Sequence, residues 1–413
     1  MNILVCNSGS SSVKFSLYEA EQELLLAEGS IDWAIRPTRL VLRSAGQAEI
    51  REELGPSEQD QALARILLDL QAGTSTHLPG IQGIHAVGHR VVHGGRRFTA
   101  AARITPEVKS AIDELSDLAP LHNPASLQGI RAIEEILPWV PQVAVFDTAF
   151  HTTLSAAAQT YALPRRWTTE WGIHRYGFHG LSHAYCARRA AEMLGHNGSR
   201  LVIAHLGNGG SVSAVRNGIC VDTSMGFTPL DGIVMGTRSG SLDPGVLLYL
   251  LRRQGLSVEQ LESALNYESG LLGISGISSD MRQILKEAPT SPDARLALEV
   301  YVHRLVQTIG AMAATLGGVD GLVFTAGVGE NSAKVRELVC ENLGHLGLEL
   351  DTAANARCNP DADIARRGSP GRILVISTRE DLTIVRETKR VIRSEGAAEN
   401  HIPERDTATV ETV

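Results

Sequence analysis

The chain of 413 residues has few cysteines, and those it has are scattered. The five stand at positions 6, 186, 220, 340 and 358, and no two of them form a Cys-x-x-Cys pair. This spacing argues against a disulfide framework and against a zinc cluster, and it favours a reducing compartment. Long hydrophobic runs are also absent, because no apolar stretch approaches the roughly 18–20 residues that a membrane-spanning helix needs.

An excess of basic residues is missing as well. The formal net charge is -8 and the isoelectric point is about 6.0, which argues against nucleic acid or an anionic membrane as the main partner. The first residues form a strand pattern without the charged segment and cleavage site of a secretory signal. We therefore expect a soluble, cytoplasmic protein with no nucleic-acid or membrane partner.

Size and composition bound the architecture. An apolar share of 43% and a charged share of 20% are typical of a soluble globular protein. A chain of this length is too long for one ordinary hydrophobic core, so we expect two domains, or two lobes that share one chain.

Short β-rich runs alternate with helical patterns, which predicts an α/β fold. Several of these runs are continuously apolar rather than alternating, as expected for strands that are covered on both faces. The clearest helix is predicted to begin after Ser291, with Pro292 in its first turn, and to end at Gly317. The predicted strands lie at residues 3–6, 87–92, 143–146, 201–205, 322–325 and 373–377.

Two segments carry weaker patterns. Residues 19–80 are more polar than the rest, and only short strands and helices are expected there. The tail at residues 394–413 is polar and is expected to be disordered.

One internal similarity bears on the architecture. The opening stretch ILVCNSGSSSVKFSLY and the later stretch LVIAHLGNGGSVSAVRNG both run from an apolar strand, through a turn of Asn, Gly and Ser, into a second strand. Two such hairpins in one chain suggest two similar lobes that face each other. The alternative is that turns rich in glycine and serine resemble each other by chance.

The opening loop, within VCNSGSSSVKFSL at residues 5–17, has two interpretations. Successive backbone N–H groups of such a turn can form a nest for an anion, and Lys14 would add positive charge beside it. The loop can also be a hairpin that merely tolerates small residues, since the Walker pattern G-x-x-x-x-G-K-[ST] occurs nowhere in the chain. Two further glycine-rich loops, at 206–211 and 326–331, favour phosphate binding, and the second lies between a predicted strand and a predicted helix.

The stretch HAVGHRVVHGG at residues 85–95 carries three histidines at a spacing of four. On a helix they would share one face and suggest a metal site, but the valine and glycine content favours a strand. A strand spreads the three over about 27 Å, which is too far for one metal ion. Gly88, Arg90 and Val92 would share the opposite face, so a cation and a small apolar side chain can line one pocket there, which suits a small carboxylate with a short alkyl tail. The alternative for Arg90 alone is a surface ion pair.

Other polar side chains stand among apolar or turn residues, and each has a structural alternative. Asp147 follows the apolar run VAVF, at the end of a predicted strand where α/β sites are usually built, but it can also be a satisfied structural aspartate. His179 can equally be a packed core histidine. Arg238, in a loop of small residues, could stabilise charge on a phosphoryl group in transfer. Glu380 and Asp381 follow the last predicted strand, where carboxylates can hold Mg²⁺ or simply cap the next helix.

Together these segments are far more specific than any one of them. The chain resembles the acetate kinase family, in the acetate and propionate kinase group of the actin-like phosphotransferase superfamily, from residue 1 to about residue 390. The segments that carry the resemblance are, in chain order, VCNSGSSSVKFSL, GHRVVHGG, APLHNP, VAVFDTAFH, RYGFHGLSH, HLGNGGS, DTSMGFTPLDG, MGTRSGSLDPG, ISSDMR, FTAGVGEN and the segment of Glu380.

The resemblance implies a two-lobed actin-like fold with a duplicated ribonuclease-H-like core and a nucleotide cleft between the lobes. It would explain the repeated hairpin. We expect an N-terminal lobe at residues 1–148, with 382–393 packing back onto it, and a C-terminal, nucleotide-binding lobe at 149–381.

The resemblance also implies a role for each matching residue on the phosphate side. Asn7 and Glu380 would place Mg²⁺, for which Mn²⁺ could substitute, and Lys14 would face the phosphates. The contacts to the phosphates of ATP would come from His205, Leu206, Gly207, Asn208 and Gly209. The adenosine side would be held by Asp280, Met281, Arg282, Gly327, Val328, Gly329, Glu330 and Asn331.

On the acyl side, Arg90 would bind the carboxylate of the substrate. The small apolar pocket for its methyl group would be formed by Val92, Leu121, Phe178 and Pro229. Asp147 would orient or polarise the attacking carboxylate, although no base is required, because a carboxylate at pH 7 has already lost its proton. His179 and Arg238, with His122 and Asn208 nearby, would stabilise the phosphoryl group in transfer.

The implied activity is that of a phosphotransferase with a carboxyl group as acceptor. ATP would phosphorylate acetate directly and reversibly, in a Mg²⁺-dependent in-line transfer that gives acetyl phosphate and ADP. Arg90, Arg238, Lys14, His179 and Mg²⁺ would offset the repulsion between the two anionic substrates, and closure of the lobes would exclude water. The resemblance further implies a homodimer.

Alternatives and one departure from the family pattern remain. Propionate or another short-chain acid could be the better acceptor; Val92 favours acetate, but one methylene is worth only roughly 1–3 kcal/mol. A different class is an actin- or chaperone-like ATPase, which would not need Arg90 and its apolar pocket. Where the family usually reads Thr-Asn-Glu-Glu, this chain has Thr378-Arg379-Glu380-Asp381, so a new positive charge stands beside the proposed metal residue.

Overall fold

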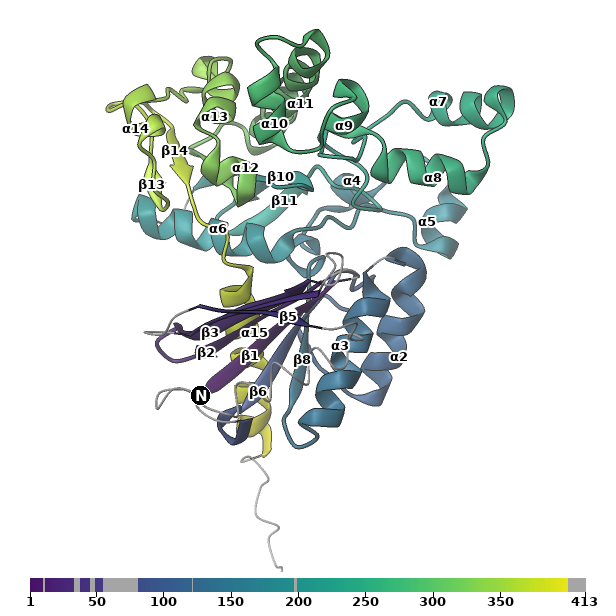
Figure 1. Cartoon of the computed structure of the whole chain (residues 1–413), viewed down its shortest axis with the longest axis vertical. Coiled ribbons are helices and arrows are strands. Elements are labelled where there is room, and N and C mark those ends of the chain that lie inside the picture. The colour runs from purple at the N-terminus through teal and green to yellow at the C-terminus, as the bar shows by residue number, and fades with distance from the viewer. Residues whose placement is uncertain are drawn as a thin grey trace, which may run out of the picture.

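The computed structural model places two β-sheets one above the other, each flanked by helices (Figure 1). The first sheet comes from the N-terminal part of the chain and the second from the C-terminal part. The structure describes residues 1–9, 12–32, 38–44, 49–54, 81–120, 122–196 and 199–399.

The first sheet has the strand order β5-β4-β3-β2-β1-β6-β8-β7. Strands β1 to β5 form an antiparallel meander, and β6 and β8 continue the sheet parallel to β1. The bounds are β1 (Asn2–Ser8), β2 (Ser12–Glu19), β3 (Leu24–Asp32), β4 (Thr38–Ser44), β5 (Ile50–Leu54), β6 (Ala86–Val91), β7 (Ala102–Arg103) and β8 (Gln142–Phe146).

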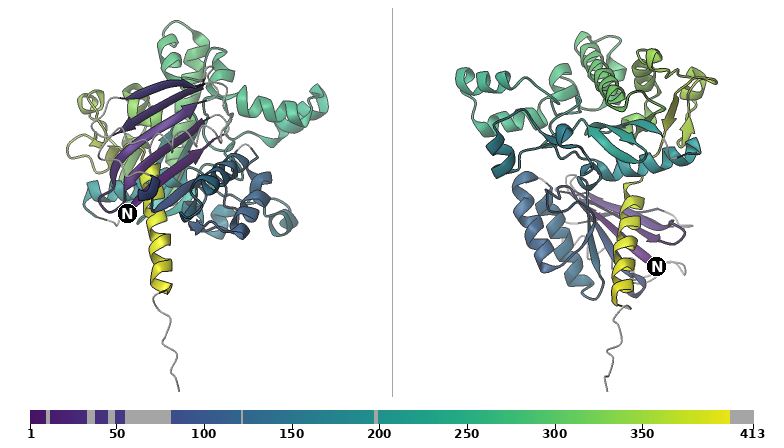
Figure 2. Two further views of the ribbon diagram at one scale, coloured as in Figure 1. Left: turned by 60° about the horizontal axis from the view of Figure 1, so that its bottom comes forward. Right: turned by 180° about the vertical axis from the view of Figure 1, so that it is seen from behind.

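Helices cover both faces of this sheet, which explains the continuous apolar runs. On one face, Leu4 of β1 packs in a cluster with Ile133 of α3 (Asn123–Ile136), beside α2 (Pro106–Glu114). On the other face, Val5 packs in a cluster with Ile384 of α15 (Glu380–Glu399). Figure 2 shows α15, in yellow, running along the sheet. Neighbouring residues of β1 therefore point into two different cores, as a strand buried on both sides requires.

The second sheet has the order β11-β10-β9-β12-β14-β13. Strands β9, β10 and β11 are antiparallel, whereas β12 and β14 run parallel to β9. This repeats the arrangement of β3-β2-β1-β6-β8 in the first sheet, so the prediction of two similar lobes from the repeated hairpin is confirmed. The bounds are β9 (Arg200–Leu206), β10 (Gly210–Arg216), β11 (Ile219–Thr223), β12 (Gly321–Thr325), β13 (Ala362–Asp363) and β14 (Arg372–Val375).

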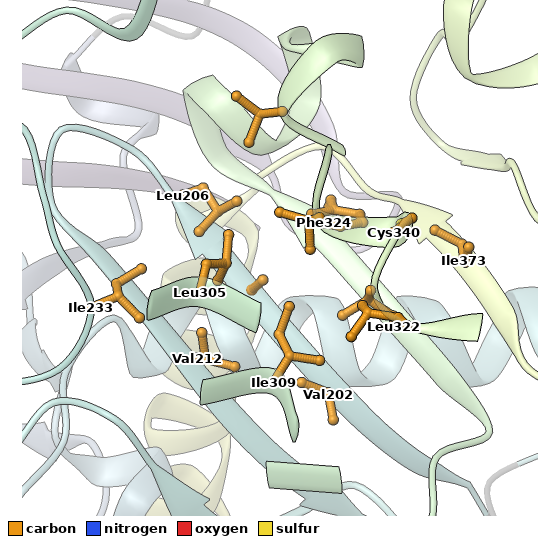
Figure 3. Packing of buried hydrophobic residues seen from close by; sticks show 14 of the residues in the cluster. Val202, Leu206, Val212, Ile233, Leu305, Ile309, Leu322, Phe324, Cys340 and Ile373 are labelled. Carbon is orange, nitrogen blue, oxygen red and sulfur yellow. The ribbon is translucent and has the colours of Figure 1, made fainter. Parts of the chain in front are cut away.

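The core of the second lobe lies between this sheet and α11 (Pro292–Leu316), as Figure 3 shows. Leu305 and Ile309 of α11 pack with Val212 of β10. The predicted ends of this helix are confirmed, because Ser291 Oγ accepts a hydrogen bond from the Ala294 backbone N–H and Gly317 adopts the left-handed conformation, with φ 70°.

The remaining helices surround the second sheet and the approach to it. They are α4 (Ala156–Gln159), α5 (Arg165–Trp171), α6 (Gly180–Leu194), α7 (Pro244–Tyr249), α8 (Val258–Tyr267), α9 (Gly270–Ser275), α10 (Met281–Glu287), α12 (Ala326–Asn331), α13 (Ala333–Cys340) and α14 (Thr352–Ala356). Short 3-10 turns are η1 (Ile81–Gly83), η2 (Leu115–Leu118), η3 (Ala149–His151) and η5 (Gly344–Leu346), and η4 (Leu250–Gln254) is a π-helical turn. Among the described residues, no helix is both long and apolar enough to cross a membrane.

One hydrophobic cluster is continuous between the two sheets. It joins Val5 of the first sheet to Ile203 of the second through Cys186 of α6 and Val385 of α15. The two lobes are thus held together by a pair of helices that pack on each other, one from each lobe.

The structure differs from the expectations for two segments. Within residues 19–80, β3 is nine residues long, and 33–37, 45–48 and 55–80 lie outside the described residues. Helix α15 continues to Glu399, so residues 394–399 are helical rather than disordered, while 400–413 lie outside the described residues. The sequence SEGAAE contains good helix formers, and extending an existing helix is much easier than starting one.

The packing of α15 on β6 generates a test. A Cβ at Gly88 would overlap Thr388 Oγ1 and Ile384 Cγ2 of the helix. We therefore expect Gly88→Ala to lower the free energy of unfolding by about 1–3 kcal/mol, the usual cost of overpacking. Gly310→Ala is the control, because no atom lies within 4 Å of the added Cβ in the middle of α11; it should raise stability by about 0.5–1 kcal/mol. Urea denaturation measures both, and an unchanged midpoint for Gly88→Ala would contradict this packing.

Candidate active site

The predicted catalytic residues meet where the two lobes meet. Asp147 follows β8 of the first sheet, and His179 immediately precedes α6 of the second lobe. The backbone N–H of Gly180 donates to the Asp147 carbonyl oxygen at 3.0 Å. A Cβ at Gly180 would overlap that oxygen, so the first residue of α6 can approach the end of β8 only because it is glycine.

Arg90 and Asp147 form a buried ion pair. Arg90 Nη2 lies 2.5 Å from Asp147 Oδ2, and Arg90 Nε lies 3.2 Å from both carboxylate oxygens. The Asp147 side chain is only 1% exposed, so the alternative of a surface ion pair for Arg90 is wrong. The third nitrogen, Arg90 Nη1, lies 3.9 Å from Glu380 Oε2. Asp147 thus occupies one edge of the guanidinium, and Nη1 remains for other contacts.

Burial and pairing act in opposite directions on both charges. Burial disfavours the charged form of Arg90, but the Asp147 and Glu380 carboxylates outweigh it and raise the pKa of Arg90 above its ordinary value. Burial raises the pKa of the Asp147 carboxyl, and the guanidinium of Arg90 opposes that shift. The pair therefore places a permanent positive charge at the site, next to a carboxylate that holds it in place.

Helix α15 covers part of the strand face that carries Arg90. Gly88 and Arg90 share a face of β6, as predicted, and Gly88 lies beneath Ile384 and Thr388 of α15. Arg90 reaches past the start of that helix to Glu380. Because α15 begins at Glu380, only the end of the strand beyond it is open.

The three histidines of the same stretch have separate environments. His85 Nδ1 accepts a hydrogen bond from the Asn2 backbone N–H at 3.1 Å. His89 Nε2 lies 2.7 Å from Gln142 Oε1, and the ring of the buried His93 packs edge-on against Tyr176 at 4.4 Å. In the described part of the chain, no group of three or more His, Cys, Asp or Glu side chains is arranged to hold a metal ion.

A small apolar cluster forms beside Arg90. Val92 packs against Phe178, as predicted, and the same cluster contains Tyr176, Met225 and Met235, with Leu118 and Phe227 at its edge. The two methionines could not be predicted from the sequence, because no spacing rule relates them to Val92. Leu121 lies outside the described residues. Pro229 lies beside Arg238, because its carbonyl oxygen accepts a hydrogen bond from Arg238 Nη1 at 3.4 Å.

His179 and Arg238 converge above Gly209, which precedes β10. A Cβ at Gly209 would lie 3.4 Å from Arg238 Nη1 and 3.5 Å from His179 Nε2. Two hydrogen-bond donors therefore approach one small volume that glycine leaves open. His122 lies close enough to both arginines of the site that Arg238 and Arg90, after burial, lower its pKa.

Burial lowers the pKa of the histidines of the site, which favours their neutral forms. Burial, followed by the neighbouring His205 and Arg90, lowers the pKa of His179 well below its ordinary value. Burial likewise lowers the pKa of His205 to about 4, and its ring stacks on His179 with centroids 4.2 Å apart. This direction favours a hydrogen bond from His179 over a positive charge on it.

The first hairpin brings Asn7 and Lys14 opposite each other on β1 and β2. Both line a cavity of about 470 Å³ together with Thr378 and Glu380. Asn7 and Glu380 offer amide and carboxylate oxygens, the ligand type that Mg²⁺ prefers, and Mg²⁺ usually takes only one or two protein ligands besides phosphates and water.

A second cleft, of about 730 Å³, opens in the second lobe. It is lined by eight of the residues predicted to contact the nucleotide: Gly207, Asn208, Asp280, Met281, Arg282, Gly327, Val328 and Asn331. Tyr301 of α11 and Ser279 also line it and were not predicted. In the apolar stripe of a helix, nothing in the sequence distinguishes a tyrosine that is buried in the core from one that lines a cleft.

The other residues predicted to contact the nucleotide lie elsewhere. His205 and Gly209 belong to the group around His179, and the side chain of Leu206 is buried in the core of the second lobe. Gly329 is buried as well. The Glu330 carboxylate turns inward and accepts hydrogen bonds from the backbone N–H groups of Ala326 at 2.9 Å and Thr378 at 2.8 Å.

Comparisons with known proteins agree with this arrangement. The chain matches the model of the Acetokinase family over residues 2–386. It is 51% identical over 397 residues to the acetate kinase of Microcystis aeruginosa, covering 94% of this chain and 98% of the relative. It is 48% identical over 406 residues to the acetate kinase of Nostoc punctiforme, covering 95% and 100%.

Solved structures give the same result. The Porphyromonas gingivalis acetate kinase superposes with a TM-score of 0.88 at 40% identity, covering 95% of this chain and 99% of that one. A propionate kinase from Francisella tularensis has a TM-score of 0.88 at 39% identity, covering 94% and 99%. The chain therefore belongs to the acetokinase family, with the two-lobed actin-like fold of acetate and propionate kinases.

Proposed function

We propose that the protein is an acetate kinase, which transfers the γ-phosphoryl group of ATP to acetate and gives acetyl phosphate and ADP reversibly. The observation that supports this most directly is the convergence of Arg238 Nη1 and His179 Nε2 on the open space above Gly209. A cleft of about 730 Å³ is lined by Gly207 and Asn208, which directly precede Gly209, and Arg90 lies close enough to His179 to lower its pKa. The names of the relatives agree with the same activity.

The acceptor would bind at Arg90. Its Nη1 would contact the acetate carboxylate, while Asp147 holds the other edge of the guanidinium. The methyl group would point into the apolar cluster of Val92 and Phe178. Asp147 thus serves as a positioning residue for Arg90 and not as a base, because acetate is already ionised at neutral pH.

Transfer would occur in the space above Gly209. ATP and acetate are both anionic, so their repulsion dominates the barrier, and charge spreads over the phosphoryl oxygens in the loose transition state. Arg238 would supply positive charge there, and neutral His179 would donate a hydrogen bond through Nε2. Both groups are placed by the fold before the substrate arrives, so little reorganisation is needed.

Asn7 and Glu380 would hold Mg²⁺, or Mn²⁺ in its place, with Lys14 beside the phosphates. The ion, when bound, would neutralise the charge of the phosphate oxygens. Arg379, next to Glu380, is exposed and would be free to add positive charge to the same region.

We further propose that the lobes divide near residue 149 and that their closure excludes water from the transfer. The protein would be cytoplasmic, in keeping with its five unpaired cysteines, and a homodimer. The homodimer, which the family resemblance implies, is also supported by exposed large apolar side chains. They lie on the arm of α7 and α8, which projects from the second lobe in Figure 1. They are Leu242, Val246, Leu248, Tyr249, Val258 and Tyr267.

A propionate kinase is the second candidate, because the Francisella structure is as similar as the acetate kinase. A kinetic panel decides between them: acetate, propionate and butyrate with ATP, GTP or pyrophosphate, with the acyl phosphate trapped as a hydroxamate. We expect acetate with ATP to give the highest kcat/KM, since the side chains of Val92 and Phe178 would leave little room in the apolar cluster for a longer acyl chain. A higher kcat/KM for propionate would assign the second function, and ATP hydrolysis without any acid would contradict both.

The two arginines should fail in different ways. Arg90→Ala removes the acceptor contact, so the KM for acetate should rise at least about tenfold, whereas Arg238→Ala removes charge stabilisation in transfer, so kcat should fall about 100-fold or more. Because Arg90→Ala strands the buried Asp147 charge, Arg90→Lys serves as a second variant that keeps a positive charge without the planar fork.

Steady-state kinetics separate these effects. Arg366→Ala is the control, since Arg366 is exposed and pairs with Glu349 away from the site; it should leave both constants unchanged. If Arg90→Lys lowered only kcat, or if Arg238→Ala raised only the KM for acetate, the roles of the two arginines would be reversed.

Gly209 provides a steric test. Alanine there would place a methyl group 3.4 and 3.5 Å from Arg238 and His179, in ordinary van der Waals contact, so the fold should tolerate it. The methyl group would occupy the space proposed for a phosphoryl oxygen. We expect kcat of Gly209→Ala to fall at least about tenfold with little change in unfolding midpoint, whereas Gly310→Ala retains full activity. Undiminished turnover by Gly209→Ala would place the transfer elsewhere.

A further inference from the structure

A buried hydrogen-bond chain lies behind His179. Ser211 Oγ of β10 is 3.0 Å from His179 Nδ1 and 2.7 Å from His183 Nε2 of α6. Ser211 and His183 are both completely buried. One hydroxyl group therefore connects the histidine of the proposed transfer site to a second histidine that no step of the mechanism uses.

The proton count leaves two arrangements that use the single proton of the Ser211 hydroxyl. If both rings donated to Ser211 Oγ instead, that proton would be buried without an acceptor, because in the described part of the chain Ser211 Oγ has no partner besides the two histidines. In the first, His183 Nε2–H donates to Ser211 Oγ, and the Ser211 hydroxyl donates to His179 Nδ1. His179 then carries its own proton on Nε2. In the second, every donor is reversed: His179 Nδ1–H donates to Ser211, Ser211 donates to His183 Nε2, and His183 carries its proton on Nδ1.

A third arrangement, with either ring doubly protonated, is disfavoured at neutral pH. Burial, followed by His205 and Arg90, lowers the pKa of His179 well below its ordinary value, and burial, followed by His151 and His205, does the same for His183. Each ring therefore carries one proton, and the choice lies between the two neutral tautomers.

The far nitrogen of His183 decides between them. His183 Nδ1 is buried and has no hydrogen-bond partner in the part of the chain that the structure describes. In the second arrangement it would be a buried N–H without an acceptor, which is rare and costly, whereas in the first it is only an unshared acceptor. The first arrangement therefore prevails.

We propose that Ser211 and His183 fix the tautomer of His179, so that Nε2 carries the proton and donates to the phosphoryl group in transfer. His179 Nε2 is the nitrogen that faces the space above Gly209, beside Arg238 Nη1. The opposite tautomer would turn a lone pair towards an anionic oxygen. Ser211 and His183 are positioning residues, and their effect on turnover rests on the proposed function.

His151 supports this hydrogen-bond chain of His179, Ser211 and His183. The ring of His151 packs edge-on against His183 with centroids 5.7 Å apart. His151 Nε2 donates to the carbonyl oxygen of Phe178 at 2.9 Å, which holds the residue that precedes His179. The buried side chain of His151 thus fixes both the ring of His183 and the backbone next to His179.

Ser211→Ala tests the proposal in the kinetics, and Ser213→Ala is the matched control. Ser213 lies on the same strand and the same face, is also completely buried, and bonds Thr223 Oγ1 at 2.9 Å instead of a histidine. We expect kcat of Ser211→Ala to fall about tenfold, with the KM values for acetate and ATP changed less than twofold. Ser213→Ala should keep its kcat. Equal losses of kcat in both variants would reduce Ser211 to a structural residue and overturn the proposal.

The tautomer itself is measured without substrate, by ¹⁵N NMR of the protein labelled at histidine, with the signal of His179 assigned through a His179→Gln variant. We expect a protonated Nε2 and an unprotonated Nδ1 in the unaltered protein, and a mixture of tautomers in Ser211→Ala. A protonated Nδ1 in the unaltered protein, or an unchanged tautomer in Ser211→Ala, would overturn the proposal. Failure of the unaltered protein to phosphorylate acetate would instead contradict the proposed function and leave the tautomer result intact.

Discussion

Asp147 is the residue on which the geometry of the site depends, because it holds both lobes at once. Its carboxylate fixes Arg90 on the neighbouring strand of the first sheet, and its carbonyl oxygen accepts the N–H of Gly180, at the first turn of α6 in the second lobe. His179, which precedes that turn, is thereby placed relative to Arg90. An uncompensated charge at this depth would be costly, so the ion pair and the lobe contact support each other. Arg90 is therefore held rigidly, although Glu380, its second carboxylate neighbour, lies far along the chain.

The two lobes contribute different electrostatics to the same space. The first lobe offers the permanent charges of Arg90 and Lys14, and the Glu380 carboxylate lies beside them at the start of α15. The second offers Arg238 and a group of buried histidines whose pKa values are lowered by burial. Neutral imidazoles can donate hydrogen bonds of defined direction without adding to the charge that must be buried, provided that their tautomers are fixed. The buried hydroxyl of Ser211 meets that condition, so a serine with no chemical role of its own becomes necessary.

How much the sequence could predict follows from how local each feature is. The ends of α11 were predictable because a cap residue, a first-turn proline and a terminal glycine act within a few residues, and the repeated hairpin revealed the duplication. The position of α15 over Gly88, the inward turn of Glu330 and the Ser211 chain depend on contacts between segments that are distant in sequence. Ser211 and His183, for example, are 28 residues apart and meet only because α6 packs against the second sheet. Family resemblance supplied the residue roles, and physical spacing alone left Asp147 and His179 undecided.

Duplication explains why so different a set of side chains can converge on one reaction. Both halves contain an antiparallel hairpin, β1–β2 or β9–β10, at the same place in the strand order of their sheet. Because the backbone scaffold is the same, each hairpin presents its turn and facing strand residues in the same way, and we propose that both face the phosphates. The first pairs Asn7 with Lys14, and the second pairs His205 with Ser211. The lobes have thus kept the geometry and divided the chemistry: one hairpin carries oxygen ligands and charge, the other carries directed hydrogen bonds. The proposed transfer would draw its arginines from both halves, the metal ligand Asn7 from one and the directed donor His179 from the other. It would therefore require both lobes, which meet at the hydrogen bond from Gly180 to Asp147.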